Sequence, residues 1–239
     1  MQGFSTVDYL ALAFFALAWF AYWAAVELTP AGRSGLNPLM DAHRRGWMEQ
    51  TVVRENRIVD TTILASLQNG TAFFASTSLI AIGGVLTLLR ATDDVVSAMT
   101  ALPFGLATTR LAWEVKVVGL AVIFVYAFYK FSWSYRIFNY AAILVGAVPP
   151  VQHANRGEAE AAAGRAAAMN IVAARHFNRG QRAFFLALAY LGWFVSAYIF
   201  MAGTAACLFV MWRRQFASDA VAALGQDSPT HGRGSSSGV

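Results

Sequence analysis

The chain has 239 residues, of which 57% are apolar and only 13% are charged, and its mean hydropathy is +0.48. Soluble globular proteins carry about 25% charged residues, so apolar side chains at this density cannot all be buried in one aqueous domain. The composition therefore predicts an integral membrane protein. It excludes a disordered chain, and the single cysteine, Cys207, excludes a disulfide scaffold and a cysteine-ligated metal domain.

Three stretches are apolar and long enough to cross a bilayer core of about 30 Å as helices. They cover residues 9–28, 61–89 and 183–212. A fourth stretch, 111–148, is apolar but carries charged residues, and it is compatible with one long helix or with two spans. One helix is favoured because residues 129–139 contain no Gly or Pro to make a turn. Its span is expected over 111–135, which makes four transmembrane helices.

The basic residues set the expected orientation, because loops rich in Lys and Arg stay in the cytoplasm. Residues 29–60 and 130–182 hold most of the Lys and Arg in the chain. We therefore expect a multi-pass protein of the inner membrane with both termini in the periplasm. The first span has an acidic residue and no basic residue before it, so we expect it to be retained rather than cleaved as a signal peptide.

Three of the predicted helices are longer than a bilayer requires. Because Pro is missing from long stretches, the second, third and fourth helices are expected to continue into the cytoplasm. These extensions cover residues 41–60, 131–148 and 158–182. The middle one is apolar and aromatic, and we expect the two charged ones to cover it. The predicted fold is all-α: a transmembrane domain over residues 1–215, continued as a cytoplasmic helical bundle, and a disordered Gly- and Ser-rich tail over 216–239.

Charged and polar residues from three helices are expected at one depth, the cytoplasmic edge of the membrane. The members of this layer are Arg54, Arg57, Asp60, Lys130, Arg136, His176, Asn178, Arg179 and Arg182. Ionisable residues next to a span are functional candidates. Only Asp60 and the nearby Glu55 balance the cations, so the layer would attract an anion or a lipid phosphate. The alternative is that these residues only anchor the helices at anionic headgroups.

A small polar face is predicted on the second span. Its members recur at helical spacing and are Ser66, Asn69, Thr77 and Gly84. Faces of this kind pack helices together in lipid. The alternative is that the face lines an aqueous or substrate path.

Enzymatic and cofactor functions find little support. The sequence has no nucleotide, zinc or serine-hydrolase motif. None of the four histidines lies inside a predicted span, so we expect no metal and no cofactor, haem included. His176 and Asp60 would be the only acid–base candidates for an enzyme acting on a lipid. The expected partners are the lipid bilayer and its anionic headgroups, not nucleic acid, because the basic residues face an anionic leaflet.

Two non-enzymatic functions stay open. The first is a channel or transporter for a small solute, above all an anion. It would act as a homo-oligomer, because four spans make a narrow bundle. The second is an accessory or scaffold subunit of a larger membrane complex, which would use the aromatic-rich spans and extended helices as contact surfaces.

Two motifs resemble a known family. One is Arg54-x-x-Arg57-Ile58-x-Asp60, followed by Asn69-Gly70-x-x-Phe73-Phe74-Ala75-Ser76-Thr77; the other is Arg175-His176-Phe177-Asn178-Arg179-Gly180-x-Arg182. With Phe138-Asn139-Tyr140 between them, they make the chain similar, over about residues 9–212, to domain of unknown function 599, an integral-membrane family of bacteria and plants. The resemblance implies a four-span membrane protein and no particular activity.

Overall fold

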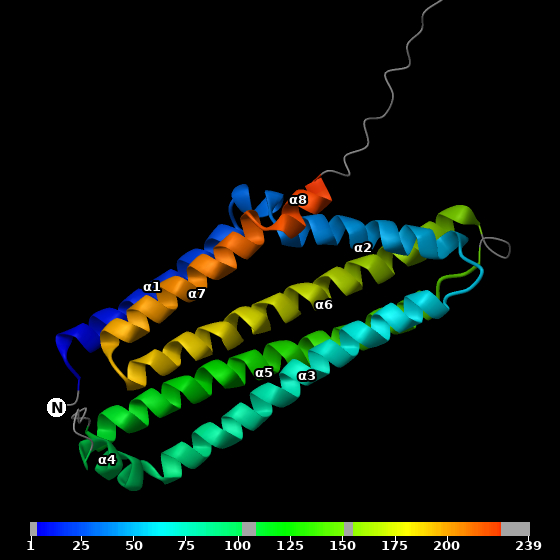
Figure 1. Cartoon of the computed structure of the whole chain (residues 1–239). Coiled ribbons are helices and arrows are strands. Elements are labelled where there is room, and N and C mark those ends of the chain that lie inside the picture. The colour runs from blue at the N-terminus through cyan, green and yellow to red at the C-terminus, as the bar shows by residue number, and fades with distance from the viewer. Residues whose placement is uncertain (1–3, 102–108, 151–154, 226–239) are drawn as a thin grey trace, which may run out of the picture.

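The computed structural model describes residues 4–101, 109–150 and 155–225, and within them every regular element is a helix (Figure 1). In chain order the elements are α1 (Thr6–Glu27), η1 (Ala31–Ser34), α2 (Leu36–Val53), α3 (Ile58–Arg90), α4 (Thr92–Ala101), α5 (Arg110–Gly146), α6 (Arg156–Tyr190), η2 (Leu191–Phe194), α7 (Ala197–Phe216) and α8 (Asp219–Gly225). The all-α prediction is confirmed.

Three long helices, α3, α5 and α6, form the spine of the molecule, and α5 packs against both others and runs antiparallel to them (Figure 1). The rings of Phe74 and Phe131 stack 5.3 Å apart and fix the register of α3 against α5. The Ser134 hydroxyl donates to the Ala173 carbonyl at 2.7 Å, and this hydrogen bond fixes the register of α5 against α6. The α5 helix is continuous, as predicted, and ends just before Pro149-Pro150.

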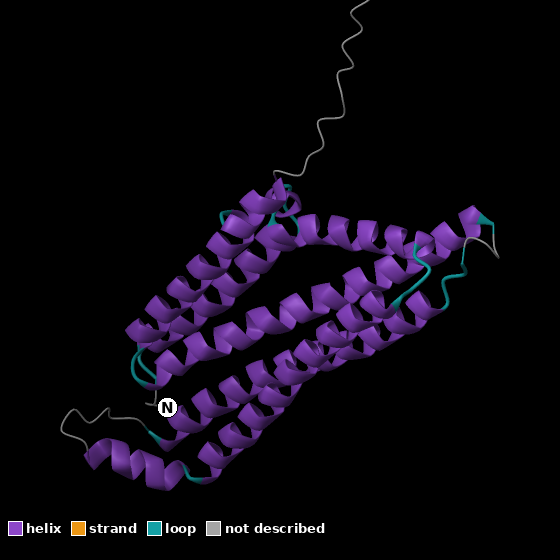
Figure 2. Ribbon diagram, turned by 45° about the vertical axis from the view of Figure 1, so that its right-hand side comes forward, coloured by secondary structure: helices purple, strands orange, loops and turns teal. Residues whose placement is uncertain are grey.

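The remaining large helices cover the spine in two halves (Figures 1 and 2). One half carries α1 and α7, which pack on each other. The Phe15 ring of α1 lies 5.0 Å from the Phe200 ring of α7 and 5.7 Å from the Tyr190 ring at the end of α6, which joins the pair to the spine. The other half carries α2, which packs on the first part of α6. In that half, α2 and the adjoining parts of α3, α5 and α6 form a four-helix bundle whose core includes Met48 and Val145.

The predicted fourth span, 183–212, is not one helix. The α6 helix ends at Tyr190, a 3₁₀ turn follows, and the chain reverses into α7. The Ser196 hydroxyl caps α7 by accepting from the Ile199 N–H at 3.1 Å, and the α carbon of Gly192 packs so close to Ile199 that a Cβ there would lie 3.1 Å from its carbonyl oxygen. Gly192 followed by the N-cap Ser196 is a local signal for the end of one helix and the start of the next. Hydropathy alone does not register this signal, because the whole stretch is apolar.

This reversal removes the basis for placing both termini on one side. Trp193, in the 3₁₀ turn η2, contacts Asp8 at the start of α1. Gln215, at the end of α7, packs on Gly35 just beyond the end of α1. The described chain therefore begins and ends at opposite ends of the α1–α7 pair.

The predicted extension 41–60 is also not a continuation of the second span. The chain turns at residues 54–57, so α2 is a separate helix that folds back along α6, where Arg44 Nε donates to Asn170 Oδ1 at 2.9 Å. The turn has a local cause, because the Asn56 side chain accepts from the Ile58 N–H at 2.9 Å and starts α3 afresh. The other two extensions are helical, as parts of α5 and α6.

Covering of the apolar 131–148 segment is only partial. Phe131 and Phe138 are buried, whereas Trp133 is 49% and Ile143 is 67% exposed. Three described helices, α1, α3 and α5, are long and apolar enough to cross a membrane, which is compatible with a membrane protein. In the tail predicted to be disordered, residues 219–225 form α8, and residues 226–239 lie outside the described part.

Candidate functional site

The residues predicted to form one cationic layer lie at two different heights along the spine. Lys130 adjoins Phe131, which is level with Phe74 on α3. Asp60 precedes Phe74 by about four helical turns, or roughly 21 Å, so the single layer does not form. The far group consists of Arg54, Arg57 and Asp60, and the near group of Lys130, His176, Asn178, Arg179 and Arg182. The antiparallel register of α3 and α5 separates them.

The far group ties the α2–α3 turn to the end of α5. The Asp60 side chain is fully buried, and its Oδ1 accepts from Trp47 Nε1 at 2.6 Å and from Arg54 Nη1 at 2.7 Å. Arg57 Nη1 donates to the Val145 carbonyl at 3.1 Å, near the C-terminal end of α5, where a cation is favourable. These contacts give the far group a structural role.

The near group adjoins a cavity of about 330 Å³, where the end of α1, η1 and the start of α2 meet α6. Four arginines and two carboxylates line it, which leaves two net positive charges. They are Arg33, Arg175, Arg179, Arg182, Glu27 and Asp41. We call this cavity the arginine pocket. Guanidinium groups suit phosphate and carboxylate ligands because they present paired donors in a fixed plane.

The two carboxylates hold three of the arginines. Arg179 binds Glu27 with two nitrogens, Nε at 3.0 Å and Nη2 at 2.5 Å, and Arg182 Nη2 donates to the same carboxylate at 2.5 Å. Arg175 Nη2 donates to Asp41 at 3.1 Å. The second terminal nitrogen of Arg182, Nη1, is buried and has no hydrogen-bond partner among the described residues. Two carboxylates therefore orient the arginines without neutralising them.

Asn178 and Arg136 have different surroundings. Asn178 lines the pocket, and its Nδ2 donates to Asn37 Oδ1 at 3.0 Å, which joins α6 to α2. Arg136 lies outside the pocket on the exposed side of α5, where its Nε donates to the Tyr140 hydroxyl at 2.6 Å. Of these two residues, only Asn178 contributes to the arginine pocket.

Lys130 and His176 lie beside the pocket. Lys130 Nζ is 5.2 Å from the centre of the Tyr126 ring, and no carboxylate of the described residues forms an ion pair with it. The pKa of His176 is lowered, chiefly because burial disfavours the charged imidazole and further because Lys130 and Arg179 are near. The imidazole is therefore mainly neutral at pH 7, and its Nδ1 is buried without a partner in the described chain.

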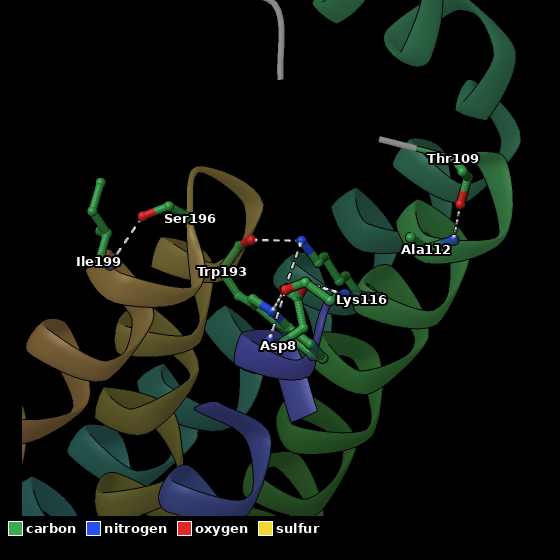
Figure 3. A network of polar contacts seen from close by, with 8 residues as sticks. Asp8, Thr109, Ala112, Lys116, Trp193, Ser196 and Ile199 are labelled. Atoms are coloured by element: carbon green, nitrogen blue, oxygen red, sulfur yellow. Dashed lines mark hydrogen bonds and ion pairs between the residues drawn. The ribbon is translucent and has the colours of Figure 1, made fainter. Parts of the chain in front are cut away.

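A second polar group lies at the opposite end of α1 (Figure 3). Asp8 Oδ1 accepts from Trp193 Nε1 at 2.7 Å, and Lys116 Nζ lies 4.0 Å from the same oxygen. Lys116 also donates to the Trp193 carbonyl at 2.8 Å. Asp8 completes a capping box with Ser5 at the start of α1. The group joins α1, α5 and η2, and its charges are satisfied within the fold.

The predicted polar face of the second span points away from the spine. Ser66, Asn69 and Gly84 are exposed and Thr77 is half-buried. The buried positions of α3 follow a different line, seven residues apart: Leu64, Thr71, Ser78 and Val85. The polar face therefore neither packs helices together nor lines a path inside one copy of the chain.

Sequence reasoning missed the acidic half of the arginine pocket. It compared the cations only with carboxylates near the second span, whereas Glu27 ends the first span and Asp41 lies in the first half of α2. An acidic residue at the end of an apolar span was the available signal. Arg33 belongs to the basic 29–60 segment, which sequence reasoning used only to predict the orientation in the membrane. The fold-back of the chain at η1 and α2, which brings Arg33 close to α6, has no signal in the hydropathy.

Comparison with known proteins identifies a family and nothing more specific. The family model of DUF599, described as a protein of unknown function, matches residues 10–220. No curated protein and no solved structure matches the chain.

Proposed function

Since this chain belongs to the DUF599 family, whose function is unknown, we propose a function from its own geometry. It is an integral membrane protein that binds a small anionic solute in the arginine pocket and passes it across the bilayer, as a homo-oligomeric channel or transporter without enzymatic activity. The observation that carries this proposal is the excess of two guanidinium groups over carboxylates in one cavity, together with the unpartnered Arg182 Nη1.

The half of the molecule with α1 and α7 suits a bilayer. From Asp8 to Glu27, α1 rises about 28 Å, close to the thickness of the hydrocarbon core. In this placement α1, α7 and the adjoining parts of α3, α5 and α6 cross the membrane, and the four-helix bundle lies outside it. Large apolar side chains of the crossing helices are more than half exposed, among them Leu17, Phe20, Ile80, Val122 and Phe209. Lipid accommodates such a surface and water does not.

The bundle side is the cytoplasm in this proposal. It carries most of the arginines, and the reversal at η2 adds Arg213 and Arg214 to the same side, in agreement with the positive-inside tendency. The start of α1 is then periplasmic and α8 cytoplasmic. The arginine pocket lies at the cytoplasmic edge, where Glu27 ends α1.

Transport requires more than one copy of the chain. The interior between the crossing helices is filled by buried apolar side chains, for example Leu120, Phe124 and Phe200. A path for an anion is therefore proposed between copies. In the membrane-crossing part of α3, the outward face offers Thr77 and Gly84, small and polar residues of the kind that helix contacts in lipid use, whereas Ser66 and Asn69 lie in the bundle part of this helix.

Anion flux through reconstituted protein tests this function. Purified full-length chain in liposomes is expected to carry chloride, phosphate or a small carboxylate faster than empty vesicles do. Arg33 is an exposed pocket residue, so Arg33→Gln removes one pocket charge with little effect on folding. Half-saturation for the anion is expected to rise about tenfold, the effect of losing one charge-assisted hydrogen bond.

Arg165→Gln is the matched control, because Arg165 is also exposed and lies on α6, far from the pocket. Its flux and half-saturation should equal those of the wild type. Folded protein that carries none of these anions, or equal weakening by both substitutions, contradicts the proposal.

A second function is favoured by one observation. At the outer end of the bundle, beyond the proposed membrane, several apolar side chains are well exposed: Val53 at 64%, Ile58 at 67%, Val59 at 59% and Ile143 at 67%. Such a patch in water is typical of a protein contact, which supports an accessory or scaffold subunit. Purification in mild detergent should then yield a stoichiometric partner that the Ile58→Ser, Ile143→Ser double variant loses.

A further inference from the structure

An apolar groove of about 670 Å³ opens on the outer surface between α1 and α5. It extends from Leu12 to Trp23, which is about 16 Å along α1. Its walls include the aromatic side chains Phe15, Trp19, Phe20, Trp23 and Tyr126. The groove lies in the half of the molecule that the proposed function places in lipid.

Small residues keep the groove open. Ala16 lines it from α1 and is exposed. Gly119 lines it from α5, and a Cβ at this position would lie only 2.2 Å from the Tyr190 hydroxyl oxygen. Tyr190 can therefore approach α5 and line the groove beside Gly119, and the space above it remains free.

Cations lie at the end of the groove that is nearest to Trp23. Tyr126 belongs to the groove wall, and Lys130 Nζ lies 5.2 Å from its ring centre. Arg179 and Arg182 are close enough to interact electrostatically with the Tyr126 phenol. Glu27 occupies these two arginines, whereas no described carboxylate pairs with Lys130. The groove thus combines an apolar slot with an unpaired ammonium group at one end.

We propose that this groove holds one acyl chain of an anionic phospholipid, whose phosphate lies against Lys130. The aromatic walls suit a hydrocarbon chain, and the ammonium group lies at the depth where a cytoplasmic-leaflet headgroup begins. A zwitterionic lipid brings its own cation to this place, so a net anionic lipid binds better. The inference rests on the proposed function only for the bilayer placement, since the groove and the arginine pocket are lined by different residues.

Native mass spectrometry of the delipidated full-length chain tests the inference. The protein is titrated with phosphatidylglycerol or with phosphatidylcholine of identical acyl chains, and bound lipid is counted. We expect the first lipid adduct to form preferentially with phosphatidylglycerol. Lys130→Gln should reduce this preference roughly fivefold, the effect of one basic residue near an anionic headgroup. Ala16→Phe fills the groove and should remove the first adduct with either lipid.

Two matched variants serve as controls. Ala13→Phe adds the same ring to an exposed position of α1 outside the groove, and Arg136→Gln removes a cation from the exposed side of α5. Both should bind lipid as the wild type does. Equal binding of the two lipids by the wild type, or an unchanged first adduct in Ala16→Phe with a native thermal transition, overturns the inference.

The lipid test and the flux test fail separately. Lipid adducts are counted without any transport, so a chain that carries no anion can still show the expected preference. A chain that transports anions can equally bind both lipids alike, which would leave the arginine pocket in place and remove the lipid site.

Discussion

Individual charged residues in this protein differ sharply in how deeply they are buried and how many partners they have. Asp60 is fully buried, and one of its oxygens accepts two hydrogen bonds while the other, Oδ2, is buried without a partner in the described chain. Asp93 pairs with Arg110 at 2.9 Å, but both side chains are largely exposed. A buried charge is costly to disturb, whereas water replaces most of an exposed pair.

Asp60→Asn is therefore expected to destabilise the protein by about 2 kcal/mol. The substitution takes away the charge that holds Arg54 and leaves an amide without an acceptor in the buried site. Equilibrium unfolding in detergent measures the loss. Asp93→Asn is the comparison, with an expected change below about 0.5 kcal/mol. Similar losses in both variants would show that Asp60 is not a buried structural charge.

At the scale of elements, close approach of α5 and α6 depends on small residues at particular positions of α6. A Cβ at Gly180 would lie 2.9 Å from a carbon of the Phe131 ring, which is fully buried and cannot move aside freely. Gly164 has no atom within 4 Å of the corresponding position. A side chain added at Gly180 would therefore collide with a neighbour, whereas one added at Gly164 would find open space.

Gly180→Ala should destabilise the protein by about 1–3 kcal/mol through overpacking. Gly164→Ala should stabilise it by about 0.5–1 kcal/mol, because alanine loses less backbone entropy in a helix interior. Thermal unfolding of both variants in the same detergent distinguishes them by sign. A gain in stability at Gly180 would contradict the register assigned to α5 and α6.

At the scale of the whole molecule, the reversal at η2 decides which side of a membrane each end would occupy. Four spans place α8 on the same side as the start of α1, whereas the α6–α7 reversal places it on the opposite side. The two arrangements differ in one measurable property, the accessibility of the end of α7.

Single cysteines in a Cys207→Ala background test this arrangement. A membrane-impermeant maleimide should label Asp94→Cys from outside intact cells and Ala220→Cys only in inverted vesicles. Both positions are exposed and lie outside the proposed bilayer. Labelling of both cysteines from the same side would restore the four-span arrangement.

Local sequence signals determined a large part of this molecule. Apolar composition, the absence of Pro in residues 110–148 and the Pro149-Pro150 stop determined α5 as one long helix, and the chain as all-helical. The motif around Arg179 and Arg182 marked a residue cluster that does line a cavity. Each of these features depends on neighbours in the chain, so a single sequence contains the information.

Tertiary structure decided the rest. The register of α3 against α5 separates Asp60 from the level of Lys130 by roughly 21 Å along the helix axis. The fold-back at η1 and α2 brings Arg33 and Asp41 to the pocket, and the reversal at η2 divides the stretch predicted as the fourth span into two helices. Antiparallel helices with apolar faces can pack in several registers of similar hydropathy. Only the particular fit of side chains, such as Phe131 against Gly180, selects one of them.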